Sequence, residues 1–254
     1  MTKIVLITGM GRSGTKSLGT LLKHADKVDS GHERVGDRAF TIHNWYMGND
    51  SYPRAYLKQS YESLVQNVAT GHSLVDVNGH LRHSTDSFQK EFPQATVLHL
   101  VRDPRSVVPS VYLRRSDTAA QVIPKTETES LWWLGADKFD QICWNWANTT
   151  QRLLDRGFPV IQFERTLSDF EYLQAHVCDP IGTTIAKSNW QAHVAKKVNR
   201  TRGKLYRFVY AKLSGRQFNT EELRKFSEWP KANRDCLISI CGDIAEQVGY
   251  DLRS

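Results

Sequence analysis

The first 22 residues, MTKIVLITGMGRSGTKSLGTLL, constrain the fold of this chain more than any other stretch. Four apolar residues, 4–7, lead into a loop with three glycines, and a helical pattern of leucines follows. This order predicts a buried strand, a tight loop and a helix. The backbone N–H groups of such a loop and the positive end of the helix dipole attract phosphate. We therefore expect a phosphate site here, rather than an ordinary glycine-rich turn.

The spacing within the loop narrows the choice of ligand. A nucleoside triphosphatase loop has the pattern GxxxxGK[ST]. Gly9 and Gly14 have that spacing, but Thr15 stands where the lysine belongs and Lys16 comes one position late. The loop therefore departs from the pattern of a triphosphatase.

A second phosphate motif is predicted near the middle of the chain. Residues 95–101, ATVLHLV, are apolar and β-branched, and they predict a strand that ends in Arg102. Asp103 is suited to cap a following helix, and Pro104 is suited to its first position. Ser110 lies on that helix, eight residues after Arg102. We expect both side chains to reach one phosphate group.

Together the two motifs resemble those of the sulfotransferases that use 3′-phosphoadenosine 5′-phosphosulfate (PAPS), in the GRSGT form of the bacterial, carbohydrate-like branch. The resemblance implies a three-layer α/β fold of the P-loop type, with a central parallel sheet, in one domain over 1–254. It implies transfer of a sulfuryl group from PAPS to a hydroxyl or amine of a glycan or small molecule. Arg12 stands where the family has a catalytic lysine. The implied donor-binding residues are Gly11, Arg12, Ser13, Gly14, Thr15, Lys16, Ser17, Arg102 and Ser110.

Two residues compete for the role of catalytic base. Glu33 follows a predicted strand at 27–30, where the glutamate-using branches of the family carry their base. His80 follows a predicted strand at 73–77 at the offset seen in cytosolic members, although Asn78 replaces their lysine. The ordinary pKa of histidine favours His80, whereas the combination of GRSGT with an acidic loop favours Glu33. We choose Glu33, with His80 as the alternative and His83 as a weaker third candidate.

A basic segment follows in the C-terminal part. Residues 180–220 contain nine Lys or Arg and no Asp or Glu, in a chain whose net charge is +7. Such a segment gathers anions through its field, unless it is simply a solvated basic face. We expect a basic, helical C-terminal part from about residue 180. The resemblance places Arg200 and Arg202 near the 3′-phosphate of the donor.

The apolar runs and the cysteine spacing bear on where the protein resides and on whether it binds a metal. No stretch approaches the ~20 apolar residues of a membrane span, and the run at 4–7 is too short for a signal peptide. We expect a cytoplasmic protein without a membrane span. The four cysteines lack the spacing of a zinc site, so we expect reduced thiols and no metal.

Strand and helix patterns alternate along the chain, which predicts a parallel sheet of four or five strands. Among the later elements, we expect one long helical segment over 127–155, a strand over 158–163 and closing helices over 220–226 and 233–248.

Two other functions are compatible with the sequence. One is a P-loop kinase that uses ATP and magnesium, and the other is a protein without enzymatic activity that binds nucleic acid through the basic segment. We expect a nucleotide donor and an acceptor as partners, and no nucleic acid.

Overall fold

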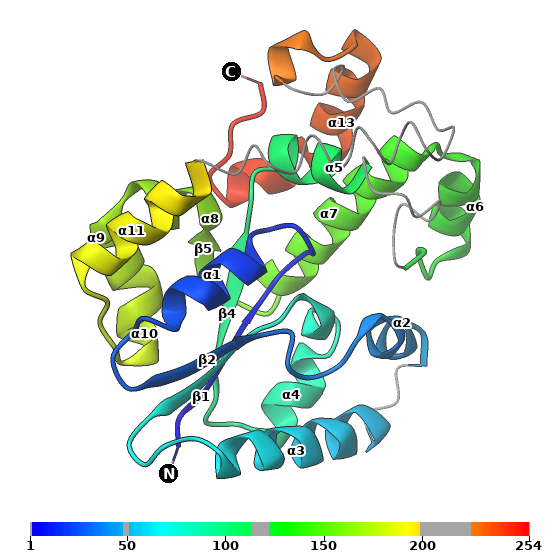
Figure 1. Cartoon of the computed structure of the whole chain (residues 1–254). Coiled ribbons are helices and arrows are strands. Elements are labelled where there is room, and N and C mark those ends of the chain that lie inside the picture. Colours follow the sequence, from blue (N-terminus) through cyan, green and yellow to red (C-terminus); the bar gives the residue numbers. More distant parts are fainter. Residues whose placement is uncertain (1, 48–50, 113–121, 199–224, 254) are drawn as a thin grey trace, which may run out of the picture.

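A computed structural model describes residues 2–47, 51–112, 122–198 and 225–253 (Figure 1). Its centre is a parallel sheet of five strands in the order β2-β3-β1-β4-β5. Because β1 lies in the middle of this order, the loop that follows it has strand ends on both sides. The strands are β1 (Ile4–Thr8), β2 (Val28–His32), β3 (Ser73–Val77), β4 (Thr96–Val101) and β5 (Val160–Gln162).

Helices connect and cover the strands. The N-terminal half contains α1 (Thr15–Leu22), α2 (Arg38–Met47), α3 (Ser51–Gln66), the short η1 (Gly79–Leu81), α4 (Thr85–Glu91) and α5 (Pro104–Tyr112). The C-terminal half contains α6 (Glu127–Gly135), α7 (Lys138–Leu154), α8 (Phe163–Ser168), α9 (Phe170–Leu173), η2 (Gln174–Cys178), α10 (Asp179–Ile181), α11 (Lys187–Val198), η3 (Phe226–Glu228) and α13 (Lys231–Gln247).

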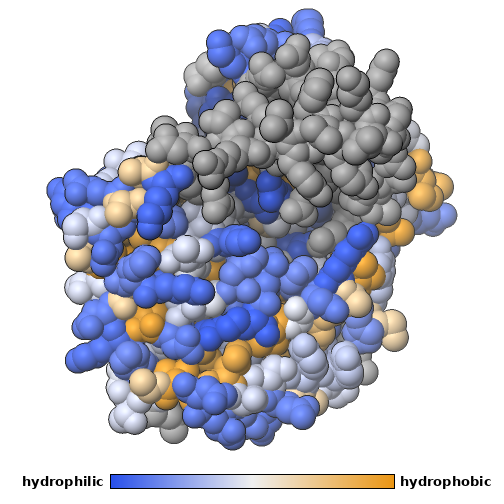
Figure 2. Space-filling model, in the orientation of Figure 1, coloured by the Kyte–Doolittle hydropathy of each residue, from blue (hydrophilic) through white to orange (hydrophobic). Residues whose placement is uncertain are grey.

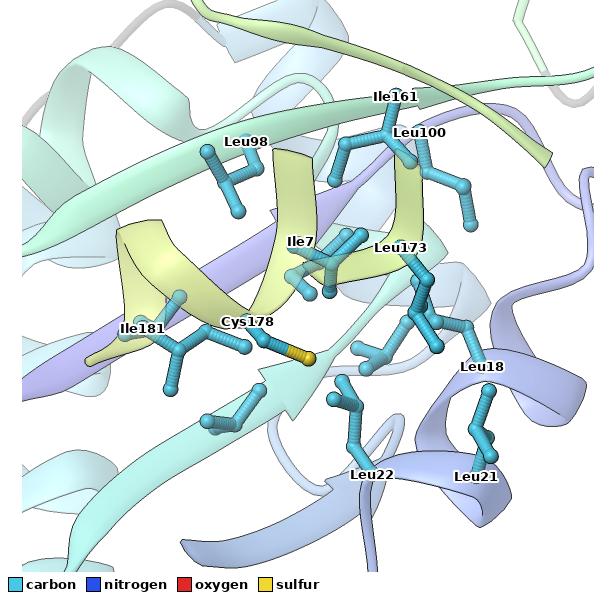
Figure 3. Packing of buried hydrophobic residues seen from close by; sticks show 14 of the residues in the cluster. Ile7, Leu18, Leu21, Leu22, Leu98, Leu100, Ile161, Leu173, Cys178 and Ile181 are labelled. Atoms are coloured by element: carbon cyan, nitrogen blue, oxygen red, sulfur yellow. The ribbon is translucent and has the colours of Figure 1, made fainter. Parts of the chain in front are cut away.

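The alternation of side chains along the strands produces three layers. Val5 and Ile7 of β1 belong to a core cluster with leucines of α1 and residues of α9 and α10, part of which Figure 3 shows. Leu6, between them, belongs to the opposite cluster with side chains of α3, α4 and α7. Successive side chains of a strand point to opposite faces, so both faces of the sheet are covered. The predicted three-layer α/β fold is confirmed.

A third core cluster joins α5, α7 and α13. It contains the fully buried Trp146, whose indole N–H donates to the backbone carbonyl of Arg102, 3.0 Å away. This cluster therefore fixes the end of β4, where the second phosphate motif begins.

Two sequence expectations need correction. Residues 127–155 form two helices rather than one, because Ala136 leaves the helical conformation and Asp137 caps α7 through the amides of Phe139 and Asp140. The strand expected at 158–163 contains only Val160–Gln162, and Phe163 already begins α8. Of the closing helices, 233–248 corresponds to α13, whereas residues 220–224 lie outside the described residues.

Hydrophilic side chains occupy most of the described surface on the face shown in Figure 2. In the part of the chain that the structure describes, no helix is long and apolar enough to cross a membrane. The same residues form no cluster of three or more metal-binding side chains. All four cysteines are free thiols, as expected.

Candidate active site

The loop between β1 and α1 is shaped by close contacts that exclude side chains at two glycines. A Cβ on Gly9 would lie 2.0 Å from the carbonyl oxygen of Leu100 in β4. Gly14 has a φ of +93°, and a Cβ there would lie 2.2 Å from the ring of Phe163. Gly14 is the N-cap residue of α1, and no side chain caps this helix. The first amides of α1 therefore lack intrahelical partners, which makes this end of the helix suitable for an anion.

Arg12 lies at the centre of the predicted donor residues. Its backbone is left-handed, with a φ of +78°, a conformation that costs a residue with a side chain about 1 kcal/mol or more. Its Nε donates to the hydroxyl of Ser110 on α5, at 2.8 Å. Its carbonyl oxygen accepts from Nη1 of Arg102, at 3.2 Å. The structure thus joins the two motifs through Arg12, which the sequence alone did not indicate.

Arg102 is oriented by groups from the start of α8. Its guanidinium lies 5.3 Å from the ring centroid of Phe163, and its Nε is 3.5 Å from Oε1 of Glu164. The other oxygen of Glu164 accepts from the hydroxyl of Tyr250, at 2.7 Å. Glu164 thus pairs with Arg102 and orients it. Residues near both ends of the chain therefore hold the second motif in place.

The two candidate bases lie in contact on the other side of the loop. Glu33 follows β2, His80 lies on η1 after β3, and the amide of Glu33 extends the pairing of these strands by donating to the carbonyl of Val77. Nε2 of His80 is 3.4 Å from Oε2 of Glu33. Like Arg12, Glu33 has a left-handed backbone, with a φ of +53°. The sequence offered Glu33 and His80 as alternative bases, whereas their side chains are in contact in the structure.

His32 is a site residue that the sequence analysis missed. Its Nε2 lies 3.0 Å from the hydroxyl of Thr15 and 3.7 Å from Oε1 of Glu33. It therefore connects the loop after β1 with Glu33, one of the two candidate bases. The only signal in the sequence was its position beside Glu33, and that position does not reveal the contact with Thr15.

A buried hydrogen-bond network beneath this pair sets its position. The carboxylate of Asp76 accepts from the hydroxyl of Tyr61, from Nδ2 of Asn78 and from the amide of Arg34. Asn78 then accepts from the amide of His80, and Arg34 is the residue after Glu33. Asp76 consequently fixes both loops, and Asn78 has a structural role where cytosolic relatives are expected to have lysine.

The pKa values of Glu33, His32 and Arg82 are all lower than their usual values. The hydrogen bond with His80 lowers the pKa of Glu33, followed by a smaller opposing effect of burial. Burial lowers the pKa of His32. Burial also lowers the pKa of Arg82 to about 10, and Glu33 partly opposes this shift. Glu33 is therefore an ionised carboxylate at neutral pH.

The remaining predicted residues have different surroundings. Ser13 is buried, and its amide donates to the carbonyl of Met10. Lys16 is exposed, and the hydroxyl of Ser17 lies 3.0 Å from Nε2 of His193 on α11. His83 lies against Trp45 and not at the pair of bases. Arg200 and Arg202 lie outside the described residues.

Comparison with known proteins identifies the fold and the family. The model of the sulfotransferase family matches residues 5–187, which include the loop, both candidate bases and the Arg102–Ser110 motif. The chain belongs to the sulfotransferase family. A search of curated proteins finds no significant match.

Solved structures of other sulfotransferases share this fold. A sulfotransferase domain from the curacin biosynthetic pathway has a TM-score of 0.57 at 15% identity, covering 99% of each chain. A sulfotransferase domain from the Synechococcus PCC 7002 olefin synthase has a TM-score of 0.56 at 16% identity, covering 99% of this chain and 97% of that one. Sulfotransferase STF9 from Mycobacterium avium has a TM-score of 0.52 at 13% identity, covering 100% of this chain and 78% of that one. These structures share the α/β fold of this protein, and the family model identifies it as a sulfotransferase.

Proposed function

We propose that this sulfotransferase takes its sulfuryl group from PAPS and transfers it to a hydroxyl or amine of a glycan or small molecule. The observation that carries the proposal is the arrangement around Arg12. Its guanidinium and carbonyl contact Ser110 and Arg102, while its own loop leads into the uncapped start of α1. This arrangement brings two anion sites together, as a nucleotide with phosphates at two positions requires.

The residues present fit such a donor. The amides at the start of α1 and the hydroxyl of Thr15 are suited to the 5′-phosphosulfate, because they are donors at the positive end of a helix. Arg102 and Ser110 are suited to the 3′-phosphate, because a guanidinium and a hydroxyl both donate to phosphate oxygens. Lys16 and Ser17 add a charge and a donor next to the loop. Arg200 and Arg202 stay predictions for the same phosphate.

We assign Arg12 the role of stabilising the leaving group. PAPS supplies an activated sulfuryl group whose departure leaves negative charge on a phosphate oxygen. The exposed guanidinium of Arg12 can donate to that oxygen as its charge grows, and donors fixed in advance are an effective source of catalysis. The contact with Ser110 orients the guanidinium before the reaction.

We assign Glu33 the role of general base, which takes the proton of the acceptor. His80 is its hydrogen-bonding partner. The acceptor oxygen or nitrogen forms its bond to sulfur and loses its proton to the carboxylate. The hydrogen bond with His80 lowers the pKa of Glu33, so the carboxylate is ionised and able to take the proton, and His80 orients it across their 3.4 Å contact. Because Glu33 is held by β2 and His80 by β3, their relative position is fixed by strand pairing.

A nucleotide-binding experiment tests the donor assignment. We expect 3′-phosphoadenosine 5′-phosphate to raise the melting temperature of the protein, with ATP and magnesium producing a smaller shift. Adenosine 5′-phosphate, which lacks the 3′-phosphate, is the matched control. A larger shift with ATP and magnesium would favour a P-loop kinase, and equal shifts for the two adenosine phosphates would remove the role of a 3′-phosphate site.

A further inference from the structure

The tail that follows α13, residues 248–253, packs into the same core cluster as β4 and α5. Gly249 turns the chain at the end of the helix with a left-handed φ of +84°. A Cβ on Gly249 would lie 2.4 Å from Nε2 of Gln162 in β5, and that nitrogen donates to the carbonyl of Val248 at 2.7 Å. A glycine in this conformation is a common way to end a helix. The turn therefore fixes the start of the tail against β5.

Tyr250 is the tail residue that reaches towards the second phosphate motif. It is only 9% exposed, and its amide donates to the carbonyl of Ala245 at 2.8 Å. Burial, followed by the charge of Glu164, raises the pKa of the Tyr250 hydroxyl. The hydroxyl is therefore protonated at neutral pH and donates a hydrogen bond to Glu164.

Glu164 receives a donor on each of its carboxylate oxygens. Oε2 accepts from the hydroxyl of Tyr250 at 2.7 Å, and Oε1 accepts from the amide of Asp103 at 3.4 Å. The exposed fraction of the Glu164 side chain is 41%, so burial alone leaves it more than one rotamer. The two hydrogen bonds select one orientation of the carboxylate.

This orientation determines how the guanidinium of Arg102 is held. Nε of Arg102 is buried and lies 3.5 Å from Oε1 of Glu164, while Nη1 donates to the carbonyl of Arg12 at 3.2 Å. A guanidinium has five N–H donors in one rigid plane, so these two contacts fix the direction of the other donors. Those other donors are the ones that a phosphate can bind.

The charge of Glu164 acts in the same sense as its orientation. Its carboxylate repels a phosphate that is bound by Arg102, and hydrogen bonds from Tyr250 and Asp103 stabilise that negative charge. Loss of the Tyr250 hydroxyl would free the carboxylate to rotate and leave its charge less compensated. Both changes weaken the binding of a phosphate at Arg102, so their effects add.

We propose that Tyr250 and Glu164 are positioning residues for the 3′-phosphate of the donor and act through the guanidinium of Arg102. Their role rests on the proposed function, because it assumes that Arg102 binds this phosphate. Tyr250 lies outside the residues 5–187 that the family model matches, so the tail adds to the donor site from beyond that part of the chain. The tail then contributes to the discrimination between nucleotides with and without a 3′-phosphate.

Calorimetry with two nucleotides tests this role. 3′-Phosphoadenosine 5′-phosphate and adenosine 5′-phosphate differ only in the 3′-phosphate, so the ratio of their affinities measures its recognition. Tyr250→Phe keeps the buried ring and should lower this ratio by about threefold to tenfold, the range expected for one hydrogen bond. Glu164→Asp keeps the charge but shortens the side chain, and it should lower the ratio further. Its half-exposed position keeps the test valid if Tyr250→Phe is unstable.

A second background shows whether Tyr250 acts through Arg102. In the Arg102→Ala protein, Tyr250→Phe should leave the ratio unchanged, because the guanidinium that it positions is absent. An equal loss in both backgrounds would indicate a general structural effect and overturn the proposal. An unchanged ratio in Tyr250→Phe or Glu164→Asp, with a lowered ratio in Arg102→Ala, would overturn it while the donor assignment stands. An unchanged ratio in Arg102→Ala would remove both together.

Tyr172→Phe is the matched control. The hydroxyl of this buried tyrosine accepts from the amide of Gln162 at 2.9 Å, so the substitution also removes one hydrogen bond near β5. Because that bond goes to the backbone and not to Glu164, the ratio should stay unchanged. A loss equal to that of Tyr250→Phe would show that removal of either hydroxyl lowers the ratio, and it would overturn the specific role of Tyr250.

Discussion

The proposed donor side and the proposed acceptor side of this site are built in different ways. On the donor side, one continuous loop supplies Gly14, the amides of α1 and Arg12, and a second short motif supplies Arg102 and Ser110. On the acceptor side, Glu33 and His80 come from separate strands and are held by a buried network around Asp76. The comparison teaches that the residues proposed to bind phosphate are close together in the sequence, whereas the placement of the candidate bases depends on strand pairing.

Each side also contains one strained residue. Arg12 and Glu33 both adopt a left-handed backbone although neither is glycine. Such strain persists only where surrounding contacts hold it, and it is concentrated at functional positions. The neighbours that hold Arg12 include Ser110 and Arg102, and those that hold Glu33 include His80 and Val77.

The largest expected effect separates the two sides by kinetics. Glu33→Gln should lower kcat by a factor of roughly 100 to 10,000, the usual contribution of a general base, because the amide cannot take the proton. Binding of 3′-phosphoadenosine 5′-phosphate should persist. Kinetics with labelled PAPS and an identified acceptor provide the measurement. His80→Ala is the comparison variant and should keep most of the rate. The reverse pattern, with an active glutamine variant and an inactive alanine variant, would make His80 the base.

Arg12 tests whether the donor side contributes to chemistry as well as to binding. Arg12→Ala should lower kcat by a factor on the order of 100, since its donors act on charge that develops in the transition state. The dissociation constant for the nucleotide should change less than kcat. Arg12→Lys keeps the charge and should recover part of the rate. A loss confined to nucleotide affinity would reduce Arg12 to a binding residue.

Arg102 provides a pure binding effect on the donor side. Arg102→Ala should weaken the binding of 3′-phosphoadenosine 5′-phosphate by at least tenfold, because one charge-assisted hydrogen bond is worth about 1.5–3 kcal/mol. Adenosine 5′-phosphosulfate, which lacks the 3′-phosphate, should be almost unaffected, and calorimetry with both nucleotides measures the difference. Arg54→Ala, on α3, is the control. If the affinities for both nucleotides fall equally, Arg102 does not bind the 3′-phosphate.

His32 tests the connection between the two sides, and its expected effect is the smallest. His32→Phe removes the contacts with Thr15 and Glu33, and loss of one neutral hydrogen bond lowers kcat by about threefold to tenfold. The apparent KM for the donor should rise at the same time, and steady-state kinetics at varied PAPS measure both. His32→Gln can still donate to the hydroxyl of Thr15 and should restore part of the loss. A variant with wild-type kcat and KM would show that the two sides act independently.

The sequence by itself determined the strand, loop and helices of the proposed donor side and the alternation of layers. The run at 4–7, the glycines of the loop and the eight-residue spacing from Arg102 to Ser110 are local patterns, and the structure contains the strand, the loop and the helix that they predict. Local patterns are readable because backbone geometry and helix ends follow from neighbouring residues. The break between α6 and α7 was missed since apolar spacing continues across it, although Asp137 was a capping signal.

Only the tertiary structure decided how distant groups meet. His80 contacts Glu33 because β2 pairs with β3 in a register that sets His32 opposite Val77, and no local pattern contains that register. The contacts of His32 with Thr15, and of Glu164 with Arg102 and Tyr250, likewise join segments far apart in the chain. Strand order and register are set by the burial of both faces of the sheet, which depends on the whole core. For that physical reason, the sequence identified candidate bases, and the fold made them a pair.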